Sequence, residues 1–187
     1  MGFYSNTTLH IMLHTILCSL FLFAAEPCTS GVPVGQRPTP YSFLVATGPQ
    51  RGQQTCYVCE QADKPTVVVF ARHLTDPLGK LMTKLDAEVP THKDSGFKVW
   101  LTHLTDKGDL NELAKWSQKQ AIKNAPVGVL EDADGPPAYK LNPDADITVL
   151  FFVKQKVVAN FAYRTGELTD DKLAEVLKGL PLLFEKK

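Results

Sequence analysis

The clearest chemical feature of the sequence is a pair of cysteines separated by two residues, Cys56-Tyr57-Val58-Cys59. This spacing lets the two sulfur atoms approach bonding distance, and it can lower the pKa of one thiol where a helix N-terminus or a cation lies nearby. Glu60 and Asp63 follow the pair, and the next cation along the chain is Lys64. Three roles therefore remain open for the cysteines: a structural disulfide, a redox-active or redox-sensing pair, and half of a metal site.

The metal alternative lacks further ligands in the sequence. Structural zinc needs four ligands, and His73, His92 and His103 have no ligand spacing to one another. Haem attachment through Cys-x-x-Cys-His is disfavoured because Glu60 stands where the histidine is required. We therefore expect neither a resident metal nor a cofactor.

A second candidate site follows the buried run Thr66–Ala71, where Arg72, His73 and Thr75 stand in sequence. Ligands of parallel α/β sheets collect at the carboxyl ends of the strands, and His103 follows a neighbouring strand at the same edge. A histidine and an arginine beside a helix N-terminus could bind an anion, which makes these residues candidate ligand-binding groups. The alternative is an ordinary polar strand end, with Asp76 as the helix cap.

The elements that must position these residues are readable from apolar patterning. Strands are expected at residues 41–47, 66–71, 97–102, 127–130, 147–153 and 157–163, and helices at residues 76–89, 110–123 and 169–179. Alternating strands and helices imply a parallel sheet with right-handed crossovers. The short gap Lys154-Gln155-Lys156 makes the last two strands an antiparallel hairpin. The segments around Val67 and Val149 should lie side by side in one parallel layer.

The beginning of the chain has the pattern of an export signal. Ile11–Ala25 is apolar and too short for a comfortable membrane span, so we expect a signal peptide over residues 1–30, a proline-rich linker over 31–40 and one domain over 41–187. The expected location is periplasmic or secreted, with a retained membrane anchor as the alternative and no stable membrane span in the mature chain. Cys28 could be cleaved off, lipidated or kept as a third thiol. Export would favour a bridged cysteine pair.

The overall charge disfavours one class of partner. Twenty basic and twenty acidic residues cancel, which gives no electrostatic basis for binding nucleic acid.

The order of these elements resembles that of the thioredoxin-like superfamily. Thr66–Ala71 resembles the central strand before the thioredoxin active site, Phe152–Gly166 the closing hairpin, and Thr169–Gly179 the last helix. The additional helix and strand between Leu110 and Leu130 are similar to the insertion of peroxiredoxin-type (AhpC/TSA-like) redoxins. The resemblance implies an exported bacterial protein of α/β class: a thioredoxin-like fold with a central, mostly parallel sheet, an antiparallel C-terminal hairpin and helices on both faces.

The sequence departs from the family pattern at the standard redox site. Thioredoxins place their Cys-x-x-Cys pair at the start of the helix after the central strand, where this chain has Thr75-Asp76-Pro77-Leu78. The peroxidatic Pro-x-x-x-Thr-x-x-Cys stretch of peroxiredoxins has no counterpart there. Ile147 stands where thioredoxins have their cis-proline, and Pro143 lies four residues earlier.

The sequence is compatible with two functions. The first is thiol–disulfide oxidoreductase activity through Cys56 and Cys59, with Cys59 or Cys28 as the resolving thiol and protein thiols or disulfides as partners. The second is a non-catalytic binding or scaffold domain in which the cysteine pair forms a structural disulfide.

Overall fold

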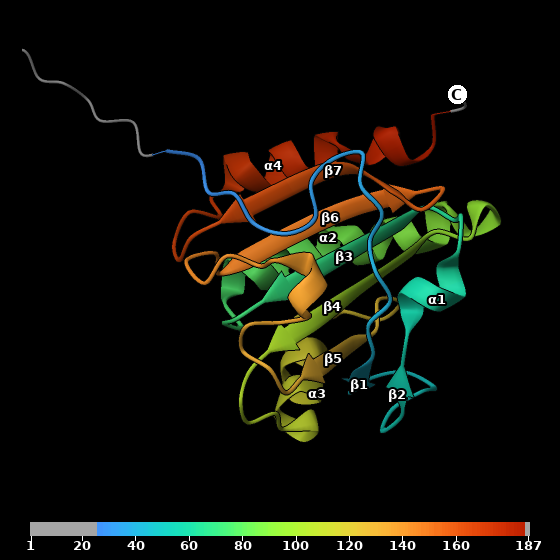
Figure 1. The fold of residues 1–187 in the computed structure, drawn as a ribbon. Coiled ribbons are helices and arrows are strands. Elements are labelled where there is room, and N and C mark those ends of the chain that lie inside the picture. Colours follow the sequence, from blue (N-terminus) through green and yellow to red (C-terminus); the bar gives the residue numbers. More distant parts are fainter. Residues whose placement is uncertain (1–25, 186–187) are drawn as a thin grey trace, which may run out of the picture.

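A mixed β-sheet with the strand order β2-β1-β5-β4-β3-β6-β7 forms the centre of the molecule (Figure 1). The computed structural model describes residues 26–185 of the 187-residue chain. The strands are β1 (Phe43–Val45), β2 (Gln54–Thr55), β3 (Thr66–Ala71), β4 (Lys98–Leu104), β5 (Val127–Leu130), β6 (Ile147–Val153) and β7 (Lys156–Tyr163). The helices are α1 (Tyr57–Gln61), α2 (Asp76–Thr91), α3 (Leu110–Lys119) and α4 (Asp170–Lys178), with 3-10 turns η1 (Lys93–Ser95), η2 (Pro137–Tyr139) and η3 (Leu180–Leu183).

Strand β3 lies in the interior because its β-branched and aromatic run is buried on both faces. Successive side chains of a strand point to opposite sides, so Val67 and Val69 enter one apolar cluster while Val68 and Phe70 enter another. β3 pairs in parallel with β4 and in antiparallel orientation with β6. The two clusters therefore form separate cores above and below a common sheet.

The expected parallel relation between the segments around Val67 and Val149 is wrong in one respect. The two segments are neighbours, with Val69 opposite Val149, but β6 runs antiparallel to β3. The connection from β5 to β6 contains only the turn η2, and its end is tied to the carboxyl edge of β3 by the hydrogen bond from Arg72 N to Asp146 O. β6 therefore starts at the edge where β3 ends and has to run back. Parallel pairing is confined to β3, β4 and β5, so the sheet is mixed rather than mostly parallel.

The two faces of the sheet are covered unequally. The three long helices α2, α3 and α4 all contribute to the cluster on one face, through residues such as Leu81, Leu113 and Val176. The opposite face is covered by α1 and η2, which contribute Tyr57 and Tyr139, and by the chain before β1, drawn in blue in front of the sheet in Figure 1. Helical segments thus lie on both faces, as expected, but only one face has long helices.

The chain before β1 packs on the sheet and does not extend away from it. We call residues 29–41 the N-terminal segment. Asn160 of β7 donates from Nδ2 to the carbonyl oxygens of Ser30 (2.8 Å) and Val32 (3.0 Å). Further along, Gly35 and Gln36 exchange two backbone hydrogen bonds with Val157. The stretch expected to be a linker is therefore ordered against β6 and β7.

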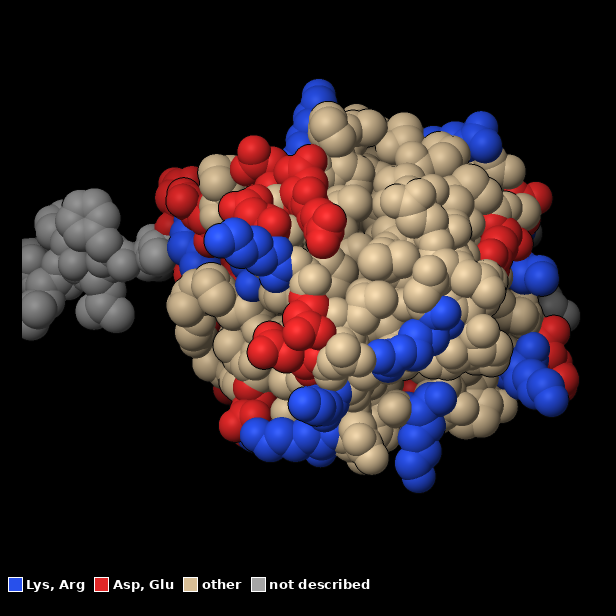
Figure 2. All heavy atoms as spheres, turned by 90° about the horizontal axis from the view of Figure 1, so that it is seen from below, with Lys and Arg blue, Asp and Glu red and all other residues tan. Residues whose placement is uncertain are grey.

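The expected signal peptide lies almost wholly outside the described residues and stays a prediction. Within residues 26–185, no helix is long and apolar enough to cross a membrane. On the face shown in Figure 2, lysine and arginine side chains alternate with aspartate and glutamate around a broad uncharged area.

Candidate functional site

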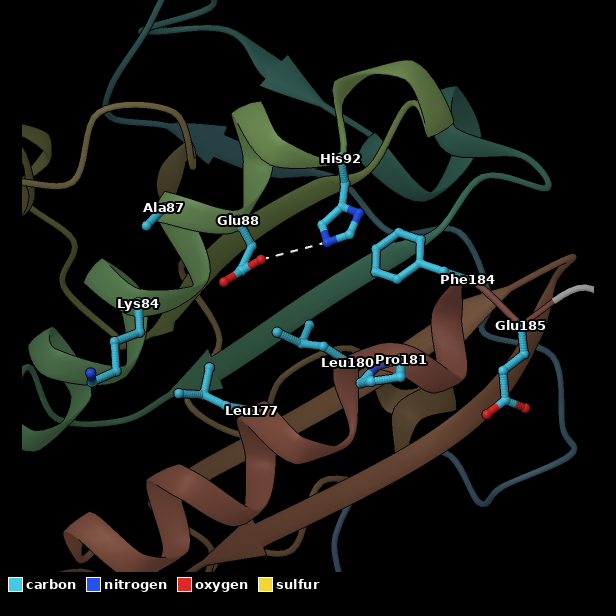
Figure 3. A pocket seen from close by; sticks show the side chains of 9 residues that line it. All are labelled: Lys84, Ala87, Glu88, His92, Leu177, Leu180, Pro181, Phe184 and Glu185. Carbon is cyan, nitrogen blue, oxygen red and sulfur yellow. Dashed lines mark ion pairs between the residues drawn. The ribbon is translucent and has the colours of Figure 1, made fainter.

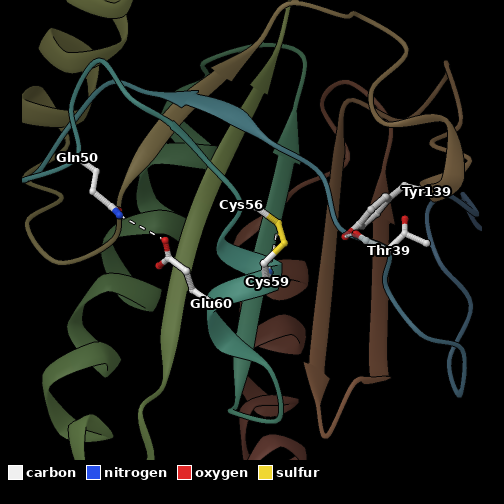
Figure 4. Close-up of a disulfide and its surroundings, with 6 residues drawn as sticks. All are labelled: Thr39, Gln50, Cys56, Cys59, Glu60 and Tyr139. Carbon is white, nitrogen blue, oxygen red and sulfur yellow. Dashed lines mark hydrogen bonds between the residues drawn. A yellow bond between two sulfur atoms is a disulfide. The ribbon is translucent and has the colours of Figure 1, made fainter.

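Cys56 and Cys59 form a disulfide at the start of the short helix α1 (Figure 4). Their Cα atoms lie 5.4 Å apart, within the range that a disulfide requires. Cys56 is also the N-cap of α1, and the backbone N–H of Cys59 donates to Cys56 Sγ at 3.3 Å. The two-residue spacing thus places one sulfur at the helix start and the other one turn along it.

Helix α1 is held against the sheet by its first residue, Tyr57. The ring of Tyr57 lies 5.5 Å from the rings of both Phe43 and Trp100, and Lys98 Nζ lies 4.3 Å from its centroid. Burial, together with the charge of Glu60, raises the pKa of Tyr57 to about 12. Because this anchor side chain is fixed between strands β1 and β4, the disulfide has a defined position over the sheet face.

The two cysteines differ in their access to solvent. Cys56 is half-buried, whereas Cys59 is exposed. Cys59 also lies on the wall of a cavity of about 230 Å³, which we call the Cys59 hollow. The other lining residues come from the N-terminal segment, from α1 and its C-cap, from the end of β6 and from the β6–β7 turn: Arg37, Pro38, Pro40, Val58, Ala62, Phe152 and Gln155.

The second candidate site lies at the opposite end of the central strands. Thr66 pairs with Phe152 at the amino end of β3, and Ala71 pairs with Ile147 at its carboxyl end. Phe152 lies five residue steps along β6 from Ile147, which is about 17 Å of extended strand. The disulfide beside Phe152 is therefore remote from the edge where the family resemblance places redox chemistry.

Thr75 caps helix α2 at this edge. Its hydroxyl oxygen accepts the backbone N–H of Leu78 at 3.3 Å, and Asp76 is the first helical residue. The expectation that Asp76 caps the helix is therefore wrong by one residue. Thr75 has the extended backbone conformation of a cap, and an acidic residue in the first turn also stabilises the helix dipole.

Arg72 is occupied by backbone carbonyl groups. Its guanidinium donates to the carbonyl oxygens of Ala145 (3.0 Å), Asn142 (3.4 Å) and Ala133. These contacts hold the connection between β5 and β6 against the end of β3. They account for an arginine at this position without a bound anion.

His73 does lie in a polar cluster, together with a residue that the sequence reasoning missed. Its Nδ1 and its backbone N–H both lie within hydrogen-bond distance of Asp146 Oδ1, at 2.7 and 3.1 Å. Asp146 is buried, while the His73 side chain is 67% exposed. His103 of β4 completes the cluster at this edge: it is half-buried, and its Nδ1 lies 3.1 Å from the carbonyl oxygen of Ala71. The available signal for Asp146 was an acidic residue directly before a buried strand.

Cys28 lies at the other end of the β6–β7 hairpin from Cys59. It is the free cysteine among residues 26–185. It lines a cavity of about 560 Å³ with Tyr163 and Arg164, and Tyr163 pairs with Ile147. Partial burial raises the pKa of the Cys28 thiol. The fold thus separates Cys28 from the disulfide by the length of the hairpin.

A wider cavity of about 770 Å³ lies between α2 and the C-terminal turn η3 (Figure 3). His92 stacks on Phe184 there, with ring centroids 3.9 Å apart, and pairs with Glu88 at 3.5 Å. This cavity contains no cysteine. Across residues 26–185 there is also no group of three histidine, cysteine or acidic residues arranged to hold a metal ion.

Comparison with solved structures identifies the fold. The chain superimposes on a candidate protein disulfide isomerase from Bacteroides thetaiotaomicron with a TM-score of 0.63 and 18% identity, covering 84% of this chain and 96% of that one. It superimposes on the thioredoxin domain of a thiol-disulfide oxidoreductase from Bacteroides vulgatus with a TM-score of 0.58 and 16% identity, covering 80% of this chain and 99% of that one. With peroxidoxin BcpB from Mycobacterium tuberculosis the TM-score is 0.57 and the identity 16%, covering 81% of this chain and 96% of that one.

At the level of sequence, no protein-family model and no curated protein matches the chain. These structural neighbours are only 14–18% identical to the chain, so the likeness shows the fold alone. The activity has to be inferred from the site. The chain has the thioredoxin-like fold shared by disulfide oxidoreductases and peroxiredoxins.

Proposed function

We propose that this protein is an exported thiol–disulfide oxidoreductase whose reactive group is the Cys56–Cys59 disulfide. The observation that carries the proposal is the exposure of Cys59 beside a half-buried Cys56. An exposed sulfur can be reached by a thiolate in line with the bond it must break, and the other sulfur is then the leaving group. Protein thiols and disulfides are the partners that this chemistry requires.

The exchange proceeds in two steps that balance in electrons. A substrate thiolate attacks Cys59 Sγ, a new intermolecular disulfide forms, and the Cys56–Cys59 bond breaks with its electron pair on Cys56 Sγ. A second substrate thiolate then attacks the substrate sulfur of the mixed disulfide and expels the Cys59 thiolate. The substrate is oxidised by two electrons, and the protein becomes a dithiol. Running in reverse, the dithiol reduces a substrate disulfide.

The N-cap hydrogen bond favours Cys56 as the leaving group. The backbone N–H of Cys59 already points at Cys56 Sγ, at 3.3 Å, in the oxidised protein. A hydrogen bond to a thiolate is stronger than one to a neutral sulfur, so this donor stabilises the charge that develops on Cys56. The sequence suggested Cys59 or Cys28 as the resolving thiol; the exposure pattern favours Cys59 as the attacked sulfur and Cys56 as its resolving partner.

A purely structural role explains the bridge less well. Closing a loop between residues only three apart stabilises the folded state by about 2 kcal/mol in the chain-entropy model, which is less than a bridge across a long loop contributes. Helix α1 is already held by Tyr57, which is buried between Phe43 and Trp100. These contacts position the segment in addition to the covalent bond.

The first test is the reduction potential of the pair, measured by equilibration of the full chain with glutathione buffers. The proposal expects a potential well above about −300 mV, because a bridge below that value resists the thiol pools that would have to exchange with it. A value below it would identify an inert structural bridge.

The second test assigns the two sulfurs. With Cys56 replaced by serine, the remaining Cys59 thiol should form a stable mixed disulfide with a model peptide disulfide. With Cys59 replaced by serine, the half-buried Cys56 should form it much more slowly. Mass spectrometry of the trapped adducts measures both, with Cys28→Ser as the matched control. Faster trapping at Cys56 than at Cys59 contradicts the assignment.

A non-catalytic scaffold domain is the second candidate, and one observation favours it. The positions that hold thiol and proline in thioredoxins are occupied here by Thr75, whose hydroxyl caps α2, and by the buried Ile147. This candidate predicts an unreactive bridge, so the reduction potential and the trapping experiment decide between the two functions.

A further inference from the structure

We propose that the Cys59 hollow is a specificity subsite that receives one apolar side chain next to the cysteine of a peptide or protein thiol, with Arg37 favouring an acidic residue close by. This inference rests on the proposed exchange reaction at Cys59. It concerns which thiols react fastest.

The size of the hollow suits a single side chain. Its volume of about 230 Å³ lies below the range of roughly 300–1,000 Å³ that encloses cofactors and drug-sized ligands. Cys59 forms part of the wall, so a side chain seated in the hollow belongs to a residue adjacent to the attacking thiol. The hollow would therefore hold the thiolate close to Cys59 Sγ, which raises the rate through proximity.

The lining of the hollow is mainly apolar. Pro38, Pro40, Val58 and Phe152 are among the lining residues; Pro40 is exposed and Val58 half-buried, whereas Pro38 and Phe152 are buried. Proline has no backbone N–H, so the two prolines offer a bound peptide no main-chain donors. Recognition must come mostly from burial of an apolar side chain against the accessible surface of Pro40 and Val58, which contributes about 25 cal/mol per Å² of apolar surface removed from water.

Hydrogen bonds fix the walls of the hollow before any substrate arrives. On one side, Tyr139 donates from its hydroxyl to the carbonyl oxygen of Thr39 at 2.8 Å, between the two prolines (Figure 4). On the other side, Asp63 holds the β6–β7 turn: its carbonyl accepts the N–H of Lys154 at 3.0 Å, and its carboxylate accepts from Gln155 Nε2 at 2.9 Å. A preformed subsite loses little conformational entropy on binding, so most of the free energy of the apolar contact is available to accelerate the exchange reaction.

The charge of the rim is positive. Arg37 is exposed and is the one charged residue that lines the hollow. A carboxylate on the substrate near the seated side chain is attracted to this guanidinium, whereas a lysine there is repelled. The effect is modest because surface charges are screened by salt.

The test compares reduction rates of the oxidised full chain by short cysteine peptides that differ only in the residue beside the cysteine. We expect leucine-containing peptides to react about fivefold faster than their glycine counterparts. Val58→Phe fills the hollow and should bring the leucine-to-glycine ratio close to one. Val34→Phe makes the same change at an exposed site outside the hollow and should leave the ratio as it is.

The charge test uses the same design. Peptides carrying a glutamate should react about twofold faster than lysine-containing ones at low salt. Arg37→Glu should reverse this order, and Lys115→Glu on the exposed surface of α3 should not.

Each outcome decides one question. A leucine-to-glycine ratio near one in the unchanged protein overturns the subsite, whatever the variants do. Because each ratio compares two peptides on the same protein, it is independent of the intrinsic reactivity of the bridge. Reduction by dithiothreitol, which has no side chain to seat, measures that reactivity separately. A bridge that dithiothreitol reduces, but that does not distinguish the peptides, leaves the exchange function intact and refutes only the subsite.

Discussion

At the residue scale, Tyr41 connects the polar atoms inside the core under the disulfide. Its hydroxyl accepts a hydrogen bond from Trp100 Nε1 at 2.8 Å and shares another with the Thr102 hydroxyl at 2.7 Å. Burial raises the pKa of Tyr41 well above its usual value, so the phenol stays neutral. One hydroxyl therefore satisfies two buried groups on β4.

Replacing Tyr41 by phenylalanine should lower the free energy of unfolding by about 2 kcal/mol, because Trp100 Nε1 and the Thr102 hydroxyl are then buried without a partner. Urea unfolding measures the loss. Tyr163→Phe is the matched control: it removes one long hydrogen bond, 3.4 Å from Lys172 O, and should cost much less. Equal losses in the two variants would contradict this account of Tyr41.

His103 should make the stability depend on pH. Burial lowers its pKa below the ordinary value of 6.5, and repulsion from His73 acts in the same direction, while the Ala71 carbonyl and Asp146 partly oppose both. Below pH 6.5 the unfolded chain binds the proton more readily than the folded protein. The free energy of unfolding should therefore fall as pH decreases from 6.5 to the folded pKa, and then level off.

Thermal unfolding across this pH range, compared between the unchanged protein and His103→Gln, isolates the contribution of His103. In the variant, the stability should decrease less as the pH is lowered. An unchanged pH profile in the variant would show that His103 does not carry it.

At the scale of elements, those with a complete local signature could be predicted from the sequence. β6 coincides with the predicted run Ile147–Val153, and α4 begins after Thr169, whose hydroxyl accepts the N–H of Lys172. Helix α1 was missed because five residues are too short for an apolar period and because its cap is a cysteine. The direction of β6 was also missed, because a strand buried on both faces carries no pattern that reveals its direction.

The β6–β7 turn shows why turn residues alone can mislead. Lys154 and Gln155 both have positive φ, 51° and 58°, although neither is glycine or asparagine. Asp63 compensates by accepting hydrogen bonds from both residues. The hairpin thus depends on a contact about ninety residues away in sequence, which no local pattern contains.

Lys154→Gly should therefore raise the free energy of unfolding by about 0.5–1 kcal/mol, since glycine adopts a positive φ without a steric penalty and the backbone bond to Asp63 is kept. Lys156→Gly, two residues later at the first position of β7, should lower it, because glycine loses more backbone entropy than lysine when it is fixed in a strand. Urea unfolding of both variants gives the comparison. A loss of stability in Lys154→Gly would show that its side chain matters more than its backbone.

At the scale of the whole molecule, the N-terminal segment covers part of the sheet face on which the disulfide lies. Asn160→Ala removes both hydrogen bonds to Ser30 O and Val32 O and should lower the stability by about 2 kcal/mol. Hydrogen exchange should then accelerate at the amides of Gly35 and Val157, which pair across the same contact. Asn111→Ala, which removes an exposed contact to Arg51, is the control. Unchanged exchange at both amides would contradict this role for Asn160.

The candidate site could be predicted only in its covalent part. The spacing of Cys56 and Cys59 indicated that the two sulfur atoms could reach bonding distance, and it left a structural disulfide, a redox-active pair and a metal half-site open. Arg37 and Phe152 join Cys59 only through the path of the N-terminal segment and the register of β6 on β3. Such contacts depend on tertiary packing, so residue types and spacing could not reveal them.

The unequal covering of the sheet determines where the molecule opens first. Helix α1 has five residues and buries two of them, whereas α2 has sixteen and buries six, so detaching α1 should require less free energy than detaching α2. Cys56 and Cys59 lie at the start of α1. If the bridge is reduced, α1 should rearrange while the three-helix side keeps its native packing, so reduction should not require global unfolding.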